Sequence, residues 1–206
     1  ESTDQTNTVL SGIMTYNRVF GDHGVDFLIG MERDWSDAES FNGYRRYFLS
    51  TALHHFNAGG DKEKNAKSDG DNWERARMNY FGRFAYNYKE KYLAEFVWRY
   101  DGSYMFAAGE RFGFFPGVLL GYRISEEDFW KENLSFINYF KLRASWGQMG
   151  NDQVYYDDKL REYQFAPTYY YEWGYIIDNA DEKGLRISRF PNPAISWERA
   201  NNFNVG

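Results

Sequence analysis

Apolar and aromatic residues take every second position over long stretches of this chain, and charged or polar residues largely fill the positions between them. In 75–88 the even positions are mostly aromatic, and the odd positions mostly carry cations or amides. The runs 92–100 and, after a Gly-rich break, 115–125 also carry most of their apolar residues on the even positions. Because successive strand side chains point to opposite faces, each run has one ring-rich or apolar face and one more polar face. The pattern predicts antiparallel sheet whose two faces meet different surroundings.

Seven runs have the length and composition of strands: 7–20, 25–35, 75–88, 92–100, 115–125, 139–148 and 196–206. The tight sequences 21–24 and 89–91 predict two hairpins, one between the first two runs and one between the next two. Between the fifth and sixth runs, 126–138 is predicted to hold one helical turn that Ser125 caps and that continues through Asn133. The other three links are longer and rich in Gly, Asp, Asn and aromatic residues: 36–74, 101–114 and 148–195.

Short and long links therefore alternate along the chain. In an up-and-down meander, alternate links lie at the same end of the sheet, so one end carries short turns and the other carries long loops. Outer-membrane barrels have this organisation, with short periplasmic turns and long extracellular loops. The predicted fold is all-β, an antiparallel up-and-down meander that forms part of a large transmembrane β-barrel.

The composition agrees with strands rather than helices as the membrane-crossing elements. The 206 residues are 43% hydrophobic and 21% aromatic, yet the mean hydropathy is only -0.74. No stretch reaches the roughly 18 to 20 consecutive apolar residues of a membrane helix, whereas a tilted strand needs only about 9 to 11 residues. The absence of Cys excludes disulfides and thiolate metal sites. A net charge of -6 argues against nucleic acid as a partner.

Several Tyr and Trp residues fall near predicted strand ends: Tyr80, Tyr88, Tyr92, Tyr100, Tyr139 and Trp146. Rings at these positions can lie at the level of the lipid headgroups, where they form the aromatic girdles of membrane barrels. The general preference of aromatic residues for strands is an equally good explanation.

The chain offers little catalytic or metal chemistry. His54 and His55 are adjacent and so point in opposite directions on a strand, and His23 is far away in sequence, so we expect no His metal site. The oxygen-rich sequence 69–72 lacks the spacing of a calcium loop and is expected to be a solvated loop. The carboxylates of 126–128 lie at a predicted helix start, where the helix dipole favours them. No nucleophile motif or phosphate-binding Gly loop is present, so we expect neither an enzyme nor a cofactor.

The segment 79–151 resembles the SusC/RagA-type TonB-dependent transporters of Bacteroidetes outer membranes. The shared motifs are Tyr80-Phe81-Gly82-Arg83, Tyr86-Asn87-Tyr88, Arg99-Tyr100-Asp101-Gly102-Ser103, Arg111-Phe112-Gly113-Phe114-Phe115-Pro116, Gly121-Tyr122-Arg123-Ile124-Ser125-Glu126-Glu127 and Lys141-Leu142-Arg143-Ala144-Ser145-Trp146-Gly147-Gln148. Asn192-Pro193 with Trp197-Glu198 is similar to the entry of the next strand in that family. Tyr104, Gly117 and Tyr122 depart from the usual family residues, without disturbing the alternation.

The resemblance implies a function and partners. Members of this family form barrels of about 22 strands around a plug, and 1–206 is identified as a partial TonB-dependent receptor β-barrel domain without the signal peptide, the plug and the remaining strands. The implied activity is TonB-dependent import of a nutrient, most often an oligosaccharide, across the bacterial outer membrane. A SusD-like surface lipoprotein and the TonB complex are the implied partners, and outer-membrane lipid surrounds the barrel.

In such a barrel the polar parity is expected to face the lumen and the ring-bearing parity the lipid. The expected lumen-facing residues are Arg77, Arg83, Arg99, Arg123, Lys141 and Arg143. The expected ligand-binding residues lie in the link 148–195, and their rings can stack on a sugar or a peptide: Tyr169, Tyr170, Tyr171, Trp173 and Tyr175. Loop-to-loop packing at the barrel mouth explains the same residues.

Two other classes of protein remain open from the sequence. A soluble carbohydrate-binding β-sandwich would use the aromatic strand faces as its core and the tyrosines of 148–195 as its binding platform. A secreted glycosidase fragment would need a pair of catalytic carboxylates. The sandwich predicts that the rings at Phe96 and Trp98 are sealed inside the protein, and the barrel predicts that they are not.

Overall fold

The computed structural model describes residues 2–48, 50, 52, 55–60, 66–134, 136–156, 158–177 and 180–206. The chain divides into two compact units. The first consists of Glu1–Leu10 and Arg33–Ala76, and the second of Ser11–Glu32 and Arg77–Gly206.

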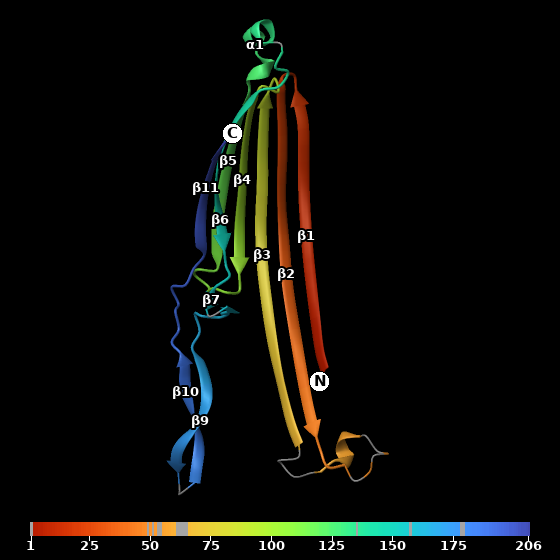
Figure 1. Cartoon of the computed structure of the whole chain (residues 1–206), viewed down its shortest axis with the longest axis vertical. Coiled ribbons are helices and arrows are strands. Elements are labelled where there is room, and N and C mark those ends of the chain that lie inside the picture. Colours follow the sequence, from red (N-terminus) through yellow and green to blue (C-terminus); the bar gives the residue numbers. More distant parts are fainter. Residues whose placement is uncertain are drawn as a thin grey trace. The chain divides into compact units, whose positions relative to one another are not determined.

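One antiparallel sheet contains all seven predicted runs (Figure 1). Its strands are β1 (Ser2–Phe20), β2 (His23–Arg45), β3 (Ala66–Tyr88), β4 (Tyr92–Ser103), β5 (Phe112–Arg123), β6 (Lys141–Asn151) and β11 (Glu198–Val205). They lie in the order β1-β2-β3-β4-β5-β6-β11, with β1 and β11 at the two edges. The predicted up-and-down meander is confirmed, because each strand pairs with the strand before and after it along this path.

The largest differences from the predicted strand bounds are in β2 and β3. β2 extends to Arg45 and β3 begins at Ala66, so much of the predicted link 36–74 is strand. The sequence 69–72, expected to be a solvated loop, lies within β3. These extensions carry polar residues on both parities, and backbone pairing rather than an apolar face accounts for them.

Within the first unit, side-chain hydrogen bonds hold the connection between β2 and β3. Arg45 donates from Nη1 to the Phe56 carbonyl at 3.0 Å and from Nε to the Gly60 carbonyl at 3.1 Å. Phe56–Ala58 forms the short 3-10 helix η1 between them. Ser40 donates to the Asp71 carbonyl at 3.3 Å.

Within the second unit, the link between β5 and β6 holds the 3-10 turn η3 (Ile124–Glu126) and the helix α1 (Asp128–Asn133). The predicted helical turn through Asn133 is confirmed, but the predicted cap is wrong. Glu127 occupies the N-cap position of α1 and makes no side-chain capping bond. Ser125 is drawn into η3, two residues earlier, and its buried hydroxyl has no hydrogen-bond partner in the described part of the chain.

The sequence predicted that the link between β6 and β11 is a loop, but this link contains strands. It contains one hairpin of β7 (Tyr155–Tyr156) and β8 (Lys159–Leu160), and a longer one of β9 (Thr168–Ile177) and β10 (Ala180–Arg189). The aromatic and β-branched residues of β9 favour a strand, but they fall on both parities and so lack the alternation of the main sheet.

Few apolar side chains are buried among the described residues: Ala38, Met105, Phe106 and Phe115. In the second unit, Phe106 and Phe115 pack against Trp197, with ring centroids 5.4 and 5.2 Å apart. Phe96, in contrast, is 40% exposed. No second sheet seals the aromatic face within the described ranges, which contradicts the β-sandwich alternative. None of the described helices is long and apolar enough to cross a membrane.

Candidate functional site

The register of the sheet assigns every side chain of β3 to β6 and β11 to one of two faces. Residues directly opposite each other on antiparallel strands share a face, as do Arg83 and Val97, or Phe84 and Phe96. Following the pairs from strand to strand, the odd positions of β3 to β6 and the even positions of β11 form one face. We call this the polar face, and the opposite one the aromatic face.

All six residues expected to line a lumen lie on the polar face: Arg77, Arg83, Arg99, Arg123, Lys141 and Arg143. Arg83 and Arg99 pair with carboxylates on neighbouring or nearby positions, at 2.8 Å from Glu95 and 2.9 Å from Asp101. The sequence had grouped these cations by parity alone, and the sheet brings them together on one surface.

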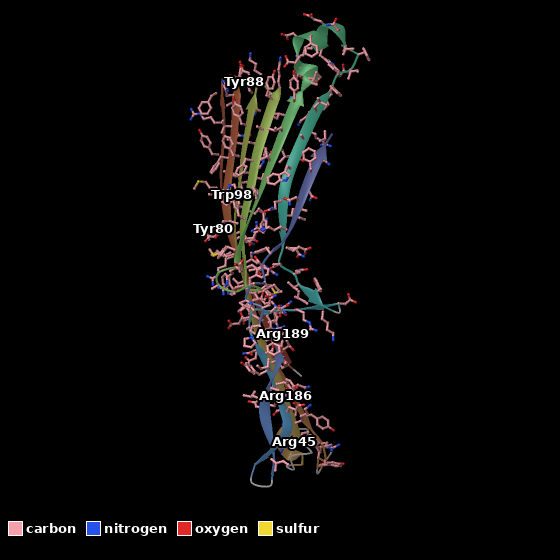
Figure 2. All side chains as sticks on the ribbon, turned by 90° about the vertical axis from the view of Figure 1, so that its left-hand side faces the viewer. Arg45, Tyr80, Tyr88, Trp98, Arg186 and Arg189 are labelled. Carbon is pink, nitrogen blue, oxygen red and sulfur yellow. The ribbon has the colours of Figure 1, made fainter. Side chains whose placement is uncertain are left out.

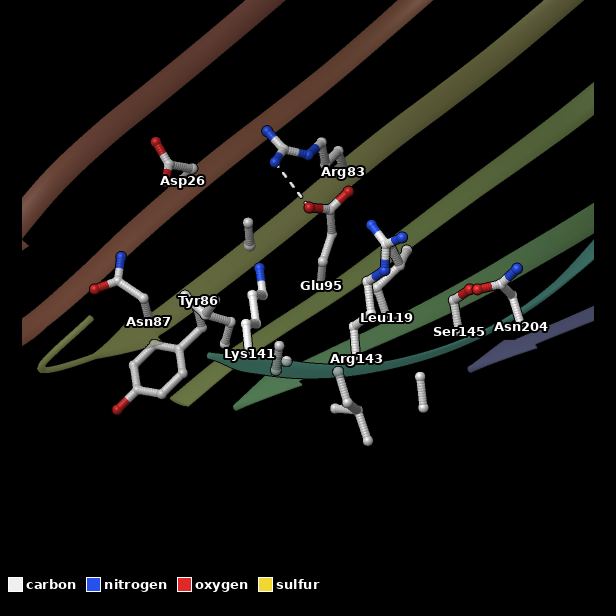
Figure 3. A pocket seen from close by; sticks show the side chains of 16 residues that line it. Asp26, Arg83, Tyr86, Asn87, Glu95, Leu119, Lys141, Arg143, Ser145 and Asn204 are labelled. Carbon is white, nitrogen blue, oxygen red and sulfur yellow. Dashed lines mark hydrogen bonds and ion pairs between the residues drawn. The ribbon is translucent and has the colours of Figure 1, made fainter. Parts of the chain in front are cut away.

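The polar face has a groove of about 530 Å³ over β3 to β6. Figure 3 shows Arg83, Glu95, Lys141 and Arg143 on the same side of the sheet, whereas Tyr86 points away on the other side. The groove therefore combines paired and unpaired charges above a floor of small and aliphatic residues, among them Gly121.

The aromatic face carries rings at two levels. On β3 and β4, Tyr88 lies opposite Tyr92, and Tyr80 lies opposite Tyr100. The two pairs are eight residues apart along each strand, which corresponds to roughly 27 Å at about 3.4 Å per residue. Figure 2 shows Tyr88 and Tyr80 separated along β3, with Trp98 between their levels.

Ring contacts extend both levels across neighbouring strands. At the short-link end, Tyr92 stacks on Tyr122 with centroids 5.1 Å apart, and His23 lies 4.9 Å from Tyr88. At the other level, Tyr100 stacks on Phe112 at 4.9 Å. We call these two levels the aromatic belts. They contain four of the six girdle candidates, of which Tyr80 lies within β3 rather than near its end.

The remaining two girdle candidates differ from expectation. Trp146 lies in the middle of β6, opposite Val118 and Phe203, and so is not at a strand end as predicted. Tyr139 precedes β6, and the Arg123 guanidinium lies over its ring at 5.5 Å. The sixth strand continues to Asn151, three residues past its predicted end, so Trp146 lies farther from the strand end than predicted.

One carboxylate joins the links at the short-link end. Glu127 accepts hydrogen bonds from Lys91 Nζ at 3.1 Å, Tyr92 OH at 3.0 Å and Tyr122 OH at 3.2 Å. The hydrogen bond from Lys91, followed by that from Tyr92, lowers the pKa of Glu127 below its ordinary value. The neighbouring Glu126 pairs with Lys131 at 2.9 Å. Both carboxylates have structural partners, in line with the structural interpretation of 126–128.

At the opposite end of the strands, a second carboxylate anchors the link between β6 and β11. Asp152 accepts from Ser103 Oγ at 2.7 Å and from Arg77 Nε at 2.8 Å. Tyr104 donates to the carboxylate of Glu162. These contacts bind the beginning of the link to the end of β4 and to Arg77 in the middle of β3.

The predicted ligand-binding residues all fall on β9. The register places Tyr169 and Tyr171 opposite Ile187 and Leu185, and all four side chains are about half exposed or more. Tyr170 alternates to the other face. The side chains of Trp173 and Tyr175 are not among those described.

The other face of the hairpin is charged. Arg186 lies opposite Tyr170 in the register and pairs with Glu172 at 2.6 Å. At the base of β10, Arg189 Nη2 donates to the Tyr163 carbonyl at 3.0 Å. One face of the hairpin therefore carries Tyr169, Tyr171 and aliphatic side chains, and the other carries the ion pair of Arg186 and Glu172.

The histidines take no part in a metal cluster within the described ranges, where no three metal-ligating side chains come together. His23 Nδ1 lies 2.7 Å from Tyr86 OH. His55 is exposed, and His54 lies outside the described residues.

No protein-family model matches the chain. Individual curated proteins do match it. TonB-dependent receptor P39 of Formosa agariphila is 32% identical over 195 residues, which cover 93% of this chain and 17% of that receptor. TonB-dependent receptor P3 of the same organism is 27% identical over 206 residues, covering 100% of this chain and 20% of the receptor. TonB-dependent receptor SusC of Bacteroides thetaiotaomicron is 27% identical over 202 residues, covering 81% and 19%.

Solved structures agree on the fold. The RagAB peptide importer in its closed-closed state superposes with a TM-score of 0.78 at 20% identity, over 98% of this chain and 21% of that one. Its open-open state gives a TM-score of 0.76 at 21% identity, over 99% and 21%. The chain spans only about a fifth of the length of these relatives. They are named as receptors and importers, in agreement with the expectation that the chain is not an enzyme.

Proposed function

Because this chain belongs to the SusC/RagA type of TonB-dependent transporters, we propose that it is part of the barrel wall through which such a transporter imports a nutrient. Its location is the bacterial outer membrane. Under this proposal, 1–206 is a partial β-barrel domain, and the plug, the signal peptide and the other strands belong to the rest of the protein.

The pair of aromatic belts is the observation that carries the proposal. Barrel strands tilt by about 40°, so the roughly 27 Å between the belts corresponds to about 20 Å along the membrane normal. With the rings themselves added, this height is close to the roughly 25 Å apolar band of outer-membrane barrels. Between the belts, the aromatic face presents side chains such as Phe84, Phe96 and Leu120. Lipid is the solvent that suits this face.

The polar face then borders the lumen. Its ion pairs and amides suit water or a polar filling. An Arg on the lipid side at the depth of Arg83, between the two belts, would cost about 2 to 4 kcal/mol. The six cations named above are accordingly assigned to the lumen wall.

The exposed rings of β9 bear on the cargo. Tyr169 and Tyr171 offer exposed rings beside aliphatic neighbours, which suits stacking on a sugar ring or on an apolar peptide side chain. We assign an oligosaccharide as the cargo, with a peptide as the second candidate because the RagAB structures are of a peptide importer. A SusD-like lipoprotein would cover the opening, and the TonB complex would supply energy.

The test uses the full-length transporter that contains this chain, in its own host. Deletion of the gene should abolish growth on the imported nutrient as sole carbon source, and depletion of TonB should have the same effect. Growth should be scored separately on oligosaccharides and on peptides, which distinguishes the two cargo classes. Unimpaired growth of the deletion strain on every oligosaccharide and peptide tested would contradict an import function.

A matched pair of variants tests the hairpin. Replacing both Tyr169 and Tyr171 by Ala should lower cargo affinity by about tenfold or more if the rings stack on the cargo. Replacing Tyr170 by Ala is the control, because this ring lies on the opposite face of the hairpin. Equal affinity in the two variants would remove the hairpin from the binding site and leave the import function standing.

A further inference from the structure

The six cations of the polar face differ in whether they have an ion-pair partner. Arg77, Arg83, Arg99 and Arg123 each lie within 3.3 Å of a carboxylate oxygen. The side chains of Lys141 and Arg143 have no hydrogen-bond or ion-pair partner among the described residues. The parity of the sequence could not separate these two from the other four.

Neither acid of the groove forms an ion pair with Lys141 or Arg143. Two carboxylates line the same groove, those of Asp26 and Glu95. Glu95 pairs with Arg83 at 2.8 Å, and Asp26 accepts a hydrogen bond from the Asn17 amide. No carboxylate in the described part of the chain therefore forms an ion pair with Lys141 or Arg143, and besides the Arg83 and Glu95 pair the only other charge in the groove is that of Asp26 (Figure 3).

The local backbone holds the two cations together. Lys141 and Arg143 are two residues apart on β6 and so share the polar face at a spacing of about 7 Å. Gly121 is the register partner of Arg143, and a Cβ added there would lie 2.9 Å from Lys141 Cε. The lysine therefore lies along the bare backbone of β5.

Hydrogen-bonding groups surround the pair. Ser145 and Asn204 are opposite each other in the register of β6 and β11, and both line the groove. A guanidinium binds a carboxylate through two parallel hydrogen bonds, and an ammonium and neighbouring hydroxyl or amide groups can complete the shell.

We propose that Lys141 and Arg143 form a carboxylate-binding site on the lumen wall. The assignment rests on the proposed function, since it takes the polar face to border the lumen. Two sources can supply this carboxylate: an acidic cargo, or an Asp or Glu side chain of the polypeptide outside this chain. The shared chemistry is a carboxylate held between an ammonium and a guanidinium.

The test compares four forms of the purified full-length transporter in detergent: the wild type, Lys141→Gln with Arg143→Gln, Lys141→Arg with Arg143→Lys, and Arg83→Gln with Glu95→Gln. The third form keeps both charges, and the fourth removes an ion pair that is already complete. The thermal midpoint is measured without ligand. Affinity is measured for tetragalacturonate against maltotetraose and for tetraglutamate against tetraglutamine, so each acidic probe has a neutral partner of equal length.

The outcomes separate the two sources. If the carboxylate belongs to the protein, the double Gln variant should lose about 2 °C or more of thermal midpoint without any ligand, and the charge-keeping variant should recover it. If the carboxylate belongs to the cargo, the midpoint should stay, and affinity for an acidic probe should fall about tenfold or more while that for its neutral partner is unchanged.

A double Gln variant with unchanged midpoint and unchanged affinity for both acidic probes would overturn the proposal. An equal loss of affinity for acidic and neutral probes, with an unchanged midpoint, would overturn it as well. Import itself is scored by growth of the deletion strain, so failure of this site and failure of the import function give different results.

Discussion

The indole of Trp98 lies over Gly82, the residue opposite it on β3: a Cβ added at Gly82 would be 2.5 Å from the indole Nε1. A glycine inside a strand has no side chain to pack, and a neighbouring aromatic ring can cover the gap. On the aromatic face this pair lies between the two belts, where the sheet is expected to meet the lipid interior.

Replacing Gly82 by Val should push the indole off its place. We expect a loss of about 1 to 3 kcal/mol in unfolding free energy, as for other overpacked sites, and a shift in Trp fluorescence. The measurement is the denaturant midpoint of the full-length protein. Gly109→Ala is the control, since a Cβ there meets nothing within 4 Å; an equal effect of both variants would show that the Trp98 contact is unimportant.

Two neighbouring residues of β4 test the assignment of the faces. Phe96→Arg places a charge on the aromatic face and should cost about 2 to 4 kcal/mol in the membrane. Val97→Arg makes a similar change on the polar face and should be far milder, as should Arg99→Ala. The readout is the amount of folded protein in the outer membrane, and equal insertion of the two Arg variants would refute the facing assignment.

Asp152 is expected to fasten the start of the link between β6 and β11. In Asp152→Ala, the Ser103 hydroxyl, which belongs to a residue only 1% exposed, loses its acceptor. Such a loss costs about 1 to 3 kcal/mol. Hydrogen exchange of the amides in 152–164 should accelerate about tenfold or more. Glu110→Ala, at an exposed position between β4 and β5, should leave the exchange unchanged.

Glu127 predicts a pH dependence at the short-link end. Its pKa is lowered in the folded chain, first by the hydrogen bond from Lys91. The stabilisation is therefore complete above the ordinary value of 4.5 and is lost as the pH falls below it, through the folded-state pKa. The thermal midpoint of the wild type should exceed that of Glu127→Gln at about pH 6, and the difference should shrink toward about pH 3.

The exposed Glu132 supplies the control for this titration, because Glu132→Gln removes a nearby carboxylate on α1. Its midpoint should follow the wild type at every pH. A constant difference between wild type and Glu127→Gln over the whole range would show that the carboxylate of Glu127 does not stabilise the fold through its charge.

Parity along the sequence sufficed for the sheet and its two faces, because a strand between lipid and water must place its apolar side chains on one side. That constraint was enough to predict all seven strands and to place the six cations of the polar face on one side of the sheet. Where both faces meet similar surroundings, the constraint vanishes. For this reason the sequence did not predict residues 36–45 of β2, residues 66–74 of β3, or the hairpin of β9 and β10.

The charges on the polar face needed the register as well as the parity. Arg83 finds Glu95 on the neighbouring strand, and Arg77 finds Asp152 from a distant link, whereas Lys141 finds no such partner in the described ranges. Similarly, the N-cap moved from Ser125 to Glu127 because a 3-10 turn precedes the helix. Ion pairs across strands depend on tertiary structure, which the pattern within one strand does not contain. The position of the N-cap depends on which type of turn precedes the helix, and the helical pattern alone does not determine this.

The hairpins inside the link between β6 and β11 bear on how the sheet assembles. Six of its strands pair with near neighbours in the chain, but β11 must return from the far side of 152–197. Hairpins form in about 1 to 10 µs, and closing a long flexible segment costs more entropy than closing a short one. By folding on themselves first, β7 to β10 shorten the distance over which the chain must search, and we expect β11 to be the last strand of this sheet to join it.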